Sequence, residues 1–308
     1  MYNRTKQCLC ATVLSLIIIG QIFYFVPSAS ALSQSSESQS IPAGLMADDW
    51  QQIKGLIDTY QQTYLKAANV EANDQFGISV AISGDTLVVG APSEDSNGSA
   101  PGDNSAGDSG AAYVFVRCGT TWTQQAYLKA GNAEANDVFG FSVAISGDTI
   151  VIGAMGEDSN GSGPDNDDAP DSGAAYMFVR SGMTWTQQAY LKAANAELNN
   201  YFGGSVAVSG DMVVIGAHKD DSIAENAGSA YVFVRSGTVW SQQVYLQADN
   251  AEAEDWYGIS VDVSSDTIVV GAGHENSDGS GPENNDALDS GAVYVFFRMN
   301  QYLPIWRR

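Results

Sequence analysis

Four copies of one sequence pattern make up most of this chain, and this repetition restricts its fold more than any other feature. The segment Tyr-Leu-Lys-Ala at residues 64–67 recurs at 127–130 and 190–193, and as Tyr-Leu-Gln-Ala at 245–248, at offsets of 63, 63 and 55 residues. Each copy also has a Gly-Ala pair and a later glycine, separated by 10 residues in the third copy and by 18 in the others. A packed scaffold with one variable surface loop produces this pattern.

Each copy is predicted to contain four strands, which in the first copy are residues 78–82, 86–89, 111–117 and 122–130. Ser83-Gly84-Asp85 separates the first two strands and is typical of a tight hairpin in which glycine adopts a positive φ. The third strand is nearly all apolar, which favours burial on both faces. The fourth alternates and is more polar, as an outer edge strand should be.

Four-stranded units that repeat at this length bury their faces against one another by radial stacking. We therefore expect an all-β fold, a β-propeller of four-stranded antiparallel blades. Trp50, Ile53 and Leu56 have helical spacing and predict a short N-terminal helix over residues 46–60.

The first residues have the layout of a secretory signal peptide. Arg4 and Lys6 precede an apolar run over residues 9–26, and Ala29-Ser30-Ala31 follows as a cleavage site. We expect cleavage after Ala31 and a secreted or cell-surface protein, and a retained membrane anchor is the alternative because the run is long. The predicted organisation is a signal peptide at 1–31, a linker with a short helix at 32–59, propeller repeats at 60–298 and an atypical tail at 299–308.

Charge and cysteine content exclude two classes of protein. The formal net charge is −23, and it becomes −25 once Arg4 and Lys6 are removed with the leader. A nucleic-acid partner requires the opposite sign of charge, so we exclude that class. Cys118 is the only cysteine after the leader, so an intrachain disulfide is impossible and we interpret it as an incidental surface thiol.

Phe76-Gly77 followed by Gly90-Ala91-Pro92 is the motif pair that names the FG-GAP repeats of integrin α-subunit N-terminal β-propellers. From about residue 60 to residue 298 the chain resembles a bacterial-type secreted variant of that family. The resemblance implies that the Phe-Gly strand is innermost and the Tyr-Leu-Lys-Ala strand outermost. It also implies that residues 60–67 complete the last blade, which has no fourth strand of its own after Arg298.

Two features depart from the family. Its propellers usually have seven blades, so a closed four-blade ring and an open arc of a larger propeller both remain possible here. The family's calcium loop lies between the first two strands of a blade. Here that connection is only Ser83-Gly84-Asp85 and its equivalents, which are too short to surround Ca²⁺ with six to eight oxygens.

Strand direction alternates, so the second-to-third and fourth-to-first connections must lie at one edge of the sheets. The second-to-third loops combine carboxylates with asparagine amides, which are the hard oxygen ligands that Ca²⁺ prefers. The alternative is that these residues serve only as turn and solvation residues. The candidate metal ligands are Glu94, Asp95, Asn97, Asp103, Asp108, Glu157, Asp158, Asn160, Asp165, Asp167, Asp168, Asp171, Glu275, Asp278, Asp286 and Asp289.

No catalytic constellation stands out, so we expect no enzyme and no catalytic residues. His218 and His274 are the only histidines and have no equivalents in the first two copies. One tryptophan per copy, at 122, 185 and 240, indicates packing between blades, and a carbohydrate platform is the alternative.

The sequence therefore predicts a secreted, non-catalytic binding or adhesion propeller that presents its acidic loops to a protein or glycan ligand, with Ca²⁺ as a candidate cofactor. The alternative is a calcium-dependent, lectin-like carbohydrate-binding protein. Neither hypothesis includes a nucleic-acid partner or a membrane span after signal cleavage.

Overall fold

The computed structural model describes residues 63–297 except 101, 165, 279, 282 and 283. All fifteen elements in this part of the chain are β-strands, and they belong to a unit that begins at Leu65. The predicted leader, the helix over 46–60 and the tail at 299–308 lie outside the described residues.

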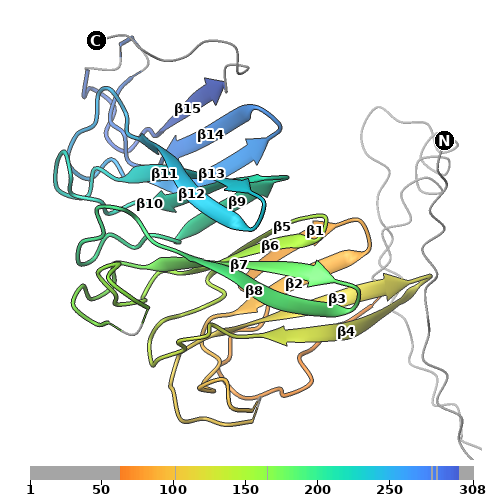
Figure 1. The fold of residues 1–308 in the computed structure, drawn as a ribbon. Coiled ribbons are helices and arrows are strands. Elements are labelled where there is room, and N and C mark those ends of the chain that lie inside the picture. Colours follow the sequence, from red (N-terminus) through yellow and green to blue (C-terminus); the bar gives the residue numbers. More distant parts are fainter. Residues whose placement is uncertain (1–62, 101, 165, 279, 282–283, 298–308) are drawn as a thin grey trace, which may run out of the picture. The chain divides into compact units, whose positions relative to one another are not determined.

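The strands form four separate antiparallel sheets, numbered here in chain order (Figure 1). Sheet 1 contains β1 (Ser79–Ser83), β2 (Thr86–Ala91), β3 (Ala111–Cys118) and β4 (Thr121–Leu128). Sheet 2 contains β5 (Ser142–Ser146), β6 (Thr149–Ala154), β7 (Ala174–Ser181) and β8 (Thr184–Leu191). Sheet 3 contains β9 (Ser205–Ser209), β10 (Met212–Ala217), β11 (Ser229–Ser236) and β12 (Val239–Leu246). Sheet 4 has three strands, β13 (Tyr257–Ser264), β14 (Thr267–Ala272) and β15 (Ala292–Phe297).

The predicted hairpin between the first two strands is confirmed. Ser83 pairs with Thr86, and Gly84 has a φ of 58° in the two-residue turn. Asp85 of the same turn accepts hydrogen bonds from Nε and Nη2 of Arg117 at 2.9 and 2.7 Å, and the guanidinium lies over the ring of Trp122. The turn thus anchors the far end of the third strand as well as reversing the chain.

Successive sheets are joined by mixed apolar clusters, as radial stacking requires. One cluster joins sheets 1 and 2, another joins sheets 2 and 3, and a third joins sheets 3 and 4. The third strands contribute to these clusters, and the first five residues of β3 are all buried. Trp185 is 8% exposed in the first cluster and donates from Nε1 to Gln125 Oε1 of the preceding sheet at 3.0 Å, which supports the packing interpretation of the tryptophans.

The Phe-Gly and Gly-Ala pairs contact each other from adjacent sheets. Phe139 inserts between sheets 1 and 2 and meets Tyr176 edge-on, with ring centroids 5.3 Å apart. A Cβ added to Gly90 would lie 2.0 Å from the carbonyl oxygen of Gly140, and one added to Gly140 would lie 2.3 Å from that of Ala111. The two glycines of the motif leave no room for a side chain because two backbones touch at this joint.

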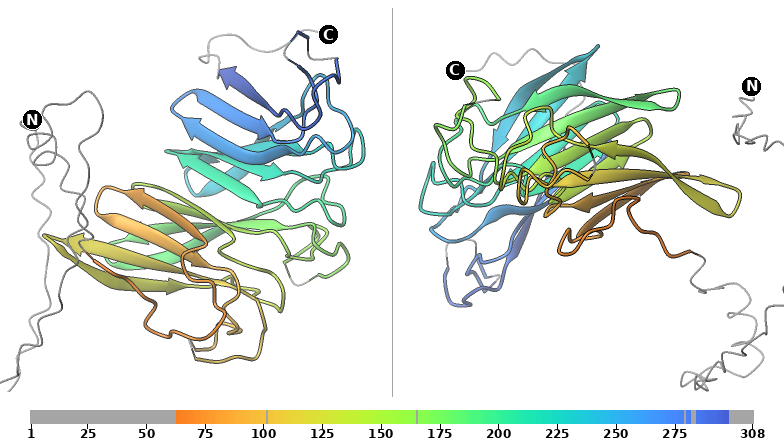
Figure 2. Two further views of the ribbon diagram at one scale, coloured as in Figure 1. Left: turned by 180° about the vertical axis from the view of Figure 1, so that it is seen from behind. Right: turned by 90° about the horizontal axis from the view of Figure 1, so that it is seen from below.

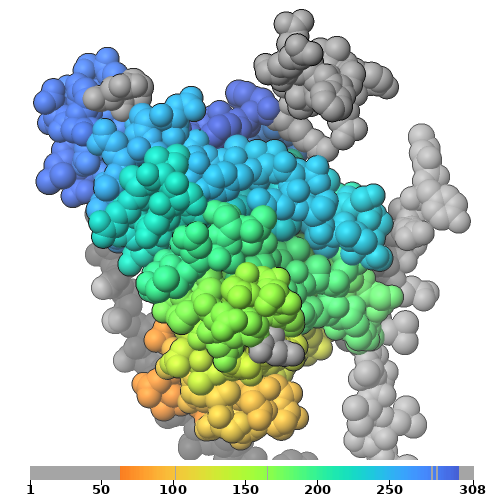
Figure 3. Space-filling view, turned by 60° about the vertical axis from the view of Figure 1, so that its left-hand side comes forward, coloured from red at the N-terminus to blue at the C-terminus, as the bar shows by residue number. Residues whose placement is uncertain are grey.

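The sheets follow one another in a series with sheets 1 and 4 at its opposite ends (Figures 2 and 3). Among the described residues, no apolar cluster joins sheet 4 back to sheet 1, so the series is open. Residues 63–67 form no strand, and Leu65 and Ala67 pack against sheet 1. Within the described residues β15 is consequently the unpaired edge of sheet 4.

Candidate functional site

One edge of the stack carries the acidic loops, as the alternation of strand direction predicts. The β2–β3 loop of sheet 1 hydrogen bonds to the connection that leads into sheet 2. Asn136 N donates to Gly107 O at 2.9 Å, and Val138 N donates to Asp108 O at 3.0 Å. The two kinds of connection therefore form one continuous edge.

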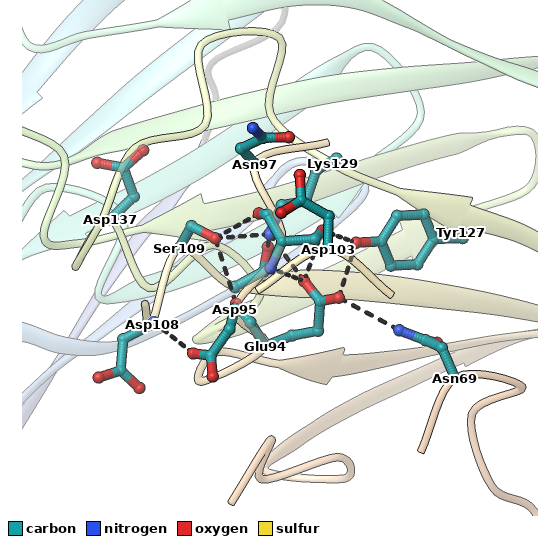
Figure 4. A network of polar contacts seen from close by, with 12 residues as sticks. Asn69, Glu94, Asp95, Asn97, Asp103, Asp108, Ser109, Tyr127, Lys129 and Asp137 are labelled. Atoms are coloured by element: carbon teal, nitrogen blue, oxygen red, sulfur yellow. Dashed lines mark hydrogen bonds and ion pairs between the residues drawn. The ribbon is translucent and has the colours of Figure 1, made fainter. Parts of the chain in front are cut away.

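A buried carboxylate lies at the base of the first of these loops (Figure 4). Glu94 is 3% exposed and accepts hydrogen bonds from Lys129 Nζ at 2.9 Å and from the Tyr127 hydroxyl at 2.9 Å. It also accepts from Ser96 N at 3.2 Å and from Asn69 Nδ2 at 3.2 Å. Burial lowers the pKa of Lys129, and the Glu94 charge opposes that shift. The carboxylate is fully engaged in holding the loop to the outer strand.

Sheet 2 repeats this cluster almost atom for atom. Glu157 is 2% exposed, forms an ion pair with Lys192 and accepts from the Tyr190 hydroxyl at 2.8 Å. The predicted ligands Glu94 and Glu157 thus lie beneath their loops, away from the loop tips. A cluster that recurs in the same place is a structural feature of the repeat.

Sheet 3 builds its cluster without a cation. Asp220 is fully buried and accepts from the hydroxyls of Tyr231 at 2.6 Å and Tyr245 at 3.1 Å, and from Asn195 Nδ2 at 3.1 Å. Gln247 occupies the place of Lys129 and Lys192 and donates to Ser229 Oγ.

Sheet 4 has the acid and lacks its usual partners. Glu275 is 3% exposed and accepts from Asn250 Nδ2 at 3.2 Å and from Ser277 N and Oγ at 3.1 and 2.9 Å. Among the described residues, no lysine is within ion-pair distance of it.

Several other predicted ligands brace the loops from within. Asp95 Oδ1 accepts from Asp108 N at 2.8 Å, and Asp158 Oδ1 accepts from Asp171 N at 2.7 Å. Asp103 accepts from Ser99 and Ser105, and these hydrogen bonds lower its pKa. Further predicted ligands make local contacts of the same kind: Asn97 with Ser99 N, Asn160 with Ser162 N, Asp168 with Asn166, and Asp278 with Ser280 N.

The remaining predicted ligands Asp108, Asp167, Asp286 and Asp289 are exposed, and Asp165 lies outside the described residues. Within the described chain, no group of three acidic, histidine or cysteine side chains is arranged to hold a metal ion. Calcium binding by these loops therefore stays a prediction.

A second buried acid lies beside the cluster of sheet 2. Asp137 is 4% exposed and accepts from Glu134 N at 2.8 Å. Burial raises its pKa to about 7, and the nearby charges of Glu157, Glu134 and Asp158 add to the shift. The equivalent residue of sheet 3 is Asn200, which donates to Asp220 Oδ2 at 3.3 Å.

Sequence reasoning missed a ladder of aromatic rings at the same edge, between sheets 3 and 4. Tyr201 stacks on His218 with ring centroids 5.7 Å apart, and Trp256 lies 5.6 Å from His218 and 4.1 Å from His274. The Lys219 ammonium lies 5.1 Å from the centroid of the Tyr201 ring. Burial lowers the pKa of His218 to about 4, and Lys219 contributes to the shift.

The aromatic residues of the ladder replace non-aromatic residues of the earlier copies. This departure from the repeat is the sequence feature that could have indicated the ladder. Tyr201 and Trp256 follow Gln75 and Val138 at the same position of earlier copies, where all four residues have a φ between 51° and 56°. Acids flank the rings as well. Glu254 accepts from Trp256 Nε1 at 3.1 Å, and Asp289 lies 2.9 Å from His274 Nδ1.

A family model for the FG-GAP repeat matches residues 59–115, 122–178, 185–233 and 240–296. The chain belongs to the FG-GAP repeat family. Each of the last three matched segments of this FG-GAP protein begins in the outer strand of one sheet and ends in the third strand of the next. FG-GAP propeller domains are typically non-enzymatic and are typical of extracellular or surface proteins.

No curated protein matches this FG-GAP chain. The chain is similar to the crystal structure of the computationally designed Ika4 protein, with a TM-score of 0.40 and 12% sequence identity over 74% of this chain and 93% of that one. In the described part of the chain, no helix is long and apolar enough to cross a membrane.

Proposed function

We propose that this FG-GAP protein is a secreted, non-catalytic binding or adhesion protein that presents its acidic loop edge to a protein or glycan ligand. One observation carries the proposal: the loops are fixed at their base and exposed at their tips. Glu94 and Glu157 hold two loop bases through buried contacts, whereas Asn97 and Asn160, farther along the same loops, are exposed. Rigid scaffolds that support variable surface loops are a common basis for binding sites.

Charge favours a partner or ion of positive sign. The chain has 36 acidic and 13 basic residues, and like charges on neighbouring loops repel one another within a Debye length of about 10 Å. A basic protein surface or a divalent cation at the loop tips relieves this repulsion. Calcium is the cation proposed, because carboxylate and amide oxygens are its preferred ligands.

The aromatic ladder favours a second candidate function, a lectin-like carbohydrate-binding protein. Trp256 and Tyr201 are half-buried, which leaves part of each ring open to solvent beside the carboxylate of Glu254. An aromatic face beside a hydrogen-bonding group combines an apolar body with a polar handle, the two features that a sugar ring requires.

Binding measured on a glycan array and on a panel of basic extracellular proteins, each with and without a calcium chelator, tests both functions. The double substitution Asp167→Asn and Asp168→Asn removes exposed loop charge, Trp256→Ala removes the ladder, and Val138→Ala is the matched control for Trp256. Protein binding that only the loop variant loses supports the adhesion function. Glycan binding that only Trp256→Ala loses supports the lectin-like function, and binding to neither panel contradicts both.

A further inference from the structure

Each joint between neighbouring sheets is built from the same backbone contact. A Cβ added to Gly90 would lie 2.0 Å from Gly140 O, and one added to Gly153 would lie 1.9 Å from Gly203 O. A serine hydroxyl accompanies the contact, because Ser79 Oγ donates to Gly140 O at 2.7 Å. Sheets 3 and 4 meet in the same way, through Gly216, Ser205 and Gly258.

The two terminal sheets each lack one half of this contact. Gly77, which holds the place of Gly140 in sheet 1, has no atom within 4 Å of an added Cβ. At Gly271, which holds the place of Gly90 in sheet 4, the three atoms nearest an added Cβ all belong to Ser260, its pairing partner on β13. The two ends of the series therefore each carry one side of the backbone contact, and neither side meets its counterpart among the described residues.

Both halves expose apolar side chains that interior sheets bury. On the surface of sheet 1 turned away from sheet 2, termed the start face, Val80 and Ile82 are 63% and 62% exposed. The interior equivalent of Ile82 is Ile145, which is buried in the cluster between sheets 1 and 2. On the surface of sheet 4 turned away from sheet 3, termed the end face, the exposed side chains are Val293, Val295 and Phe297.

The buried ion pair is split between the same two ends. Glu275 on sheet 4 has no lysine partner among the described residues, although its equivalents Glu94 and Glu157 each have one. The lysine at the matching place in the pattern is Lys66, which is exposed, and Tyr64 beside it is 76% exposed. Sheet 4 thus carries the buried acid without a lysine, and the start of the described chain carries an exposed lysine without a buried acid.

The segment that follows Lys66 contacts sheet 1 in the same way that the segment after β4 contacts sheet 2. Ala68 N donates to Gln124 Oε1 at 3.0 Å, just as Gly131 N donates to Gln187 Oε1 at 3.1 Å. Asn69 Nδ2 donates to Glu94 at 3.2 Å, the contact that Asn132 makes with Glu157. The start face is therefore prepared to receive a preceding sheet.

We propose that a second copy of this chain supplies that sheet, so that the end face of one copy packs head to tail on the start face of the next. Lys66 Nζ and the Tyr64 hydroxyl of one copy bind Glu275 of the other, and Ser260 Oγ donates to Gly77 O. Residues 63–66 lie along β15 and pair the open edge of sheet 4. Such a contact uses different surfaces on the two copies, and repeated addition either closes a ring or extends the series.

Sedimentation velocity of the full chain, across a concentration series up to tens of micromolar, measures the assembly. The unmodified chain should sediment as a dimer or larger species that dissociates on dilution. Lys66→Glu and Glu275→Lys should each shift it to a monomer, and mixing these two variants should restore assembly because each carries the charge that the other lacks. A complex formed only in the mixture identifies contact between copies, since closure within one chain gains nothing from mixing.

Gly271→Ala gives a second variant that leaves the charges unchanged. Its methyl group would lie 2.4 Å from Ser260 Oγ and would displace that hydroxyl from the place where Gly77 O of the next copy approaches, so it should abolish assembly while circular dichroism stays the same. Gly163→Ala is the control, because an added Cβ there meets nothing within 4 Å. An unmodified chain that is monomeric throughout, or assembly that survives both Gly271→Ala and Glu275→Lys, would overturn the proposal.

Discussion

Sheets 2 and 3 each bury a carboxylate at the base of the loop between their second and third strands, although the two loops differ in length. Beneath the long loop of sheet 2, Glu157 is surrounded by Lys192 and Asp137. Beneath the loop of sheet 3, which is eight residues shorter, the same three positions hold Asp220, Gln247 and Asn200. With every carboxylate ionised and the lysine protonated, both sets carry one net negative charge.

The difference shows which part of the cluster the fold requires. Both sheets keep a buried carboxylate that accepts from tyrosine hydroxyls and an asparagine amide, namely Glu157 with Tyr190 and Asn132, and Asp220 with Tyr231, Tyr245 and Asn195. The lysine and the second acid are present together in sheet 2 and absent together in sheet 3. In sheet 3 neutral donors therefore suffice for the buried carboxylate, and we expect the charge of Lys192 to matter in sheet 2 because Asp137 lies beside Glu157.

The largest expected effect comes from removing the cation of sheet 2. Lys192→Met leaves Glu157 buried without its charge partner and should lower the free energy of unfolding by about 3–5 kcal/mol. Gln247→Met in sheet 3 removes only neutral hydrogen bonds and should cost about 1 kcal/mol. Urea unfolding of both variants checks the difference, and equal losses would mean that the Lys192 charge is not needed.

The next effect concerns pH and the second acid. The pKa of Asp137 in the folded protein is about 7, above its unfolded value of about 3.9, so the folded state binds the extra proton between these values. Stability from this group is therefore greatest below pH 4 and declines as the pH rises to 7. Asp137→Asn removes that decline and should stabilise the protein by up to about 4 kcal/mol at pH 8, which corresponds to a shift of about three pKa units, with little effect at pH 4.

Thermal unfolding at pH 4 and pH 8 measures the Asp137 effect, and sheet 3 supplies the reverse substitution. Asn200→Asp places an acid beside Asp220 without a lysine, so it should destabilise the protein most at pH 8. If Asp137→Asn destabilised the protein equally at both pH values, the raised pKa would have no part in its stability.

Calcium provides a smaller test of the long and short loops. If the long loops bind Ca²⁺, a tenfold excess over Kd should stabilise the protein by about 1.4 kcal/mol, which is a rise of about 3–6 °C in Tm. Neutralising the predicted ligands of the sheet 2 loop should reduce this rise, and these are Asp165, Asp167, Asp168 and Asp171. Neutralising Asp221 and Glu225 of the short loop should leave it unchanged. Ionic-strength-matched NaCl is the salt control, and an equal rise with NaCl would contradict calcium binding.

The smallest effect is expected where the two sheets do not differ. Asp148 and Asp211 hold Arg180 and Arg235 at the opposite edge through equivalent ion pairs, in which the aspartate is exposed and the arginine is mostly buried. Asp148→Asn and Asp211→Asn should each lower stability by less than about 1 kcal/mol, and by the same amount. A large difference between them in urea unfolding would show that the sheets differ away from the loop edge too.

Much of the fold could be predicted because its signals are local. The apolar third strand, the alternating fourth strand and the turn at Ser83-Gly84-Asp85 each depend on neighbouring residues, and the structure has all three. The candidate site was harder to predict. Exposed loop acids such as Asp108 and buried ones such as Glu94 have the same kind of sequence around them, so composition could not separate them.

The sequence alone determined the number of sheets, their strand order and the edge at which the acids gather, because repeat spacing and strand alternation follow directly from the chain. Only the tertiary structure decided which carboxylates are buried. Lys129 reaches Glu94 across 35 residues because the outer strand of the sheet returns to the base of the loop. It also decided that the joint between sheets is left open at Gly77 and Gly271, since an unmet backbone contact becomes visible only when every neighbour is in place.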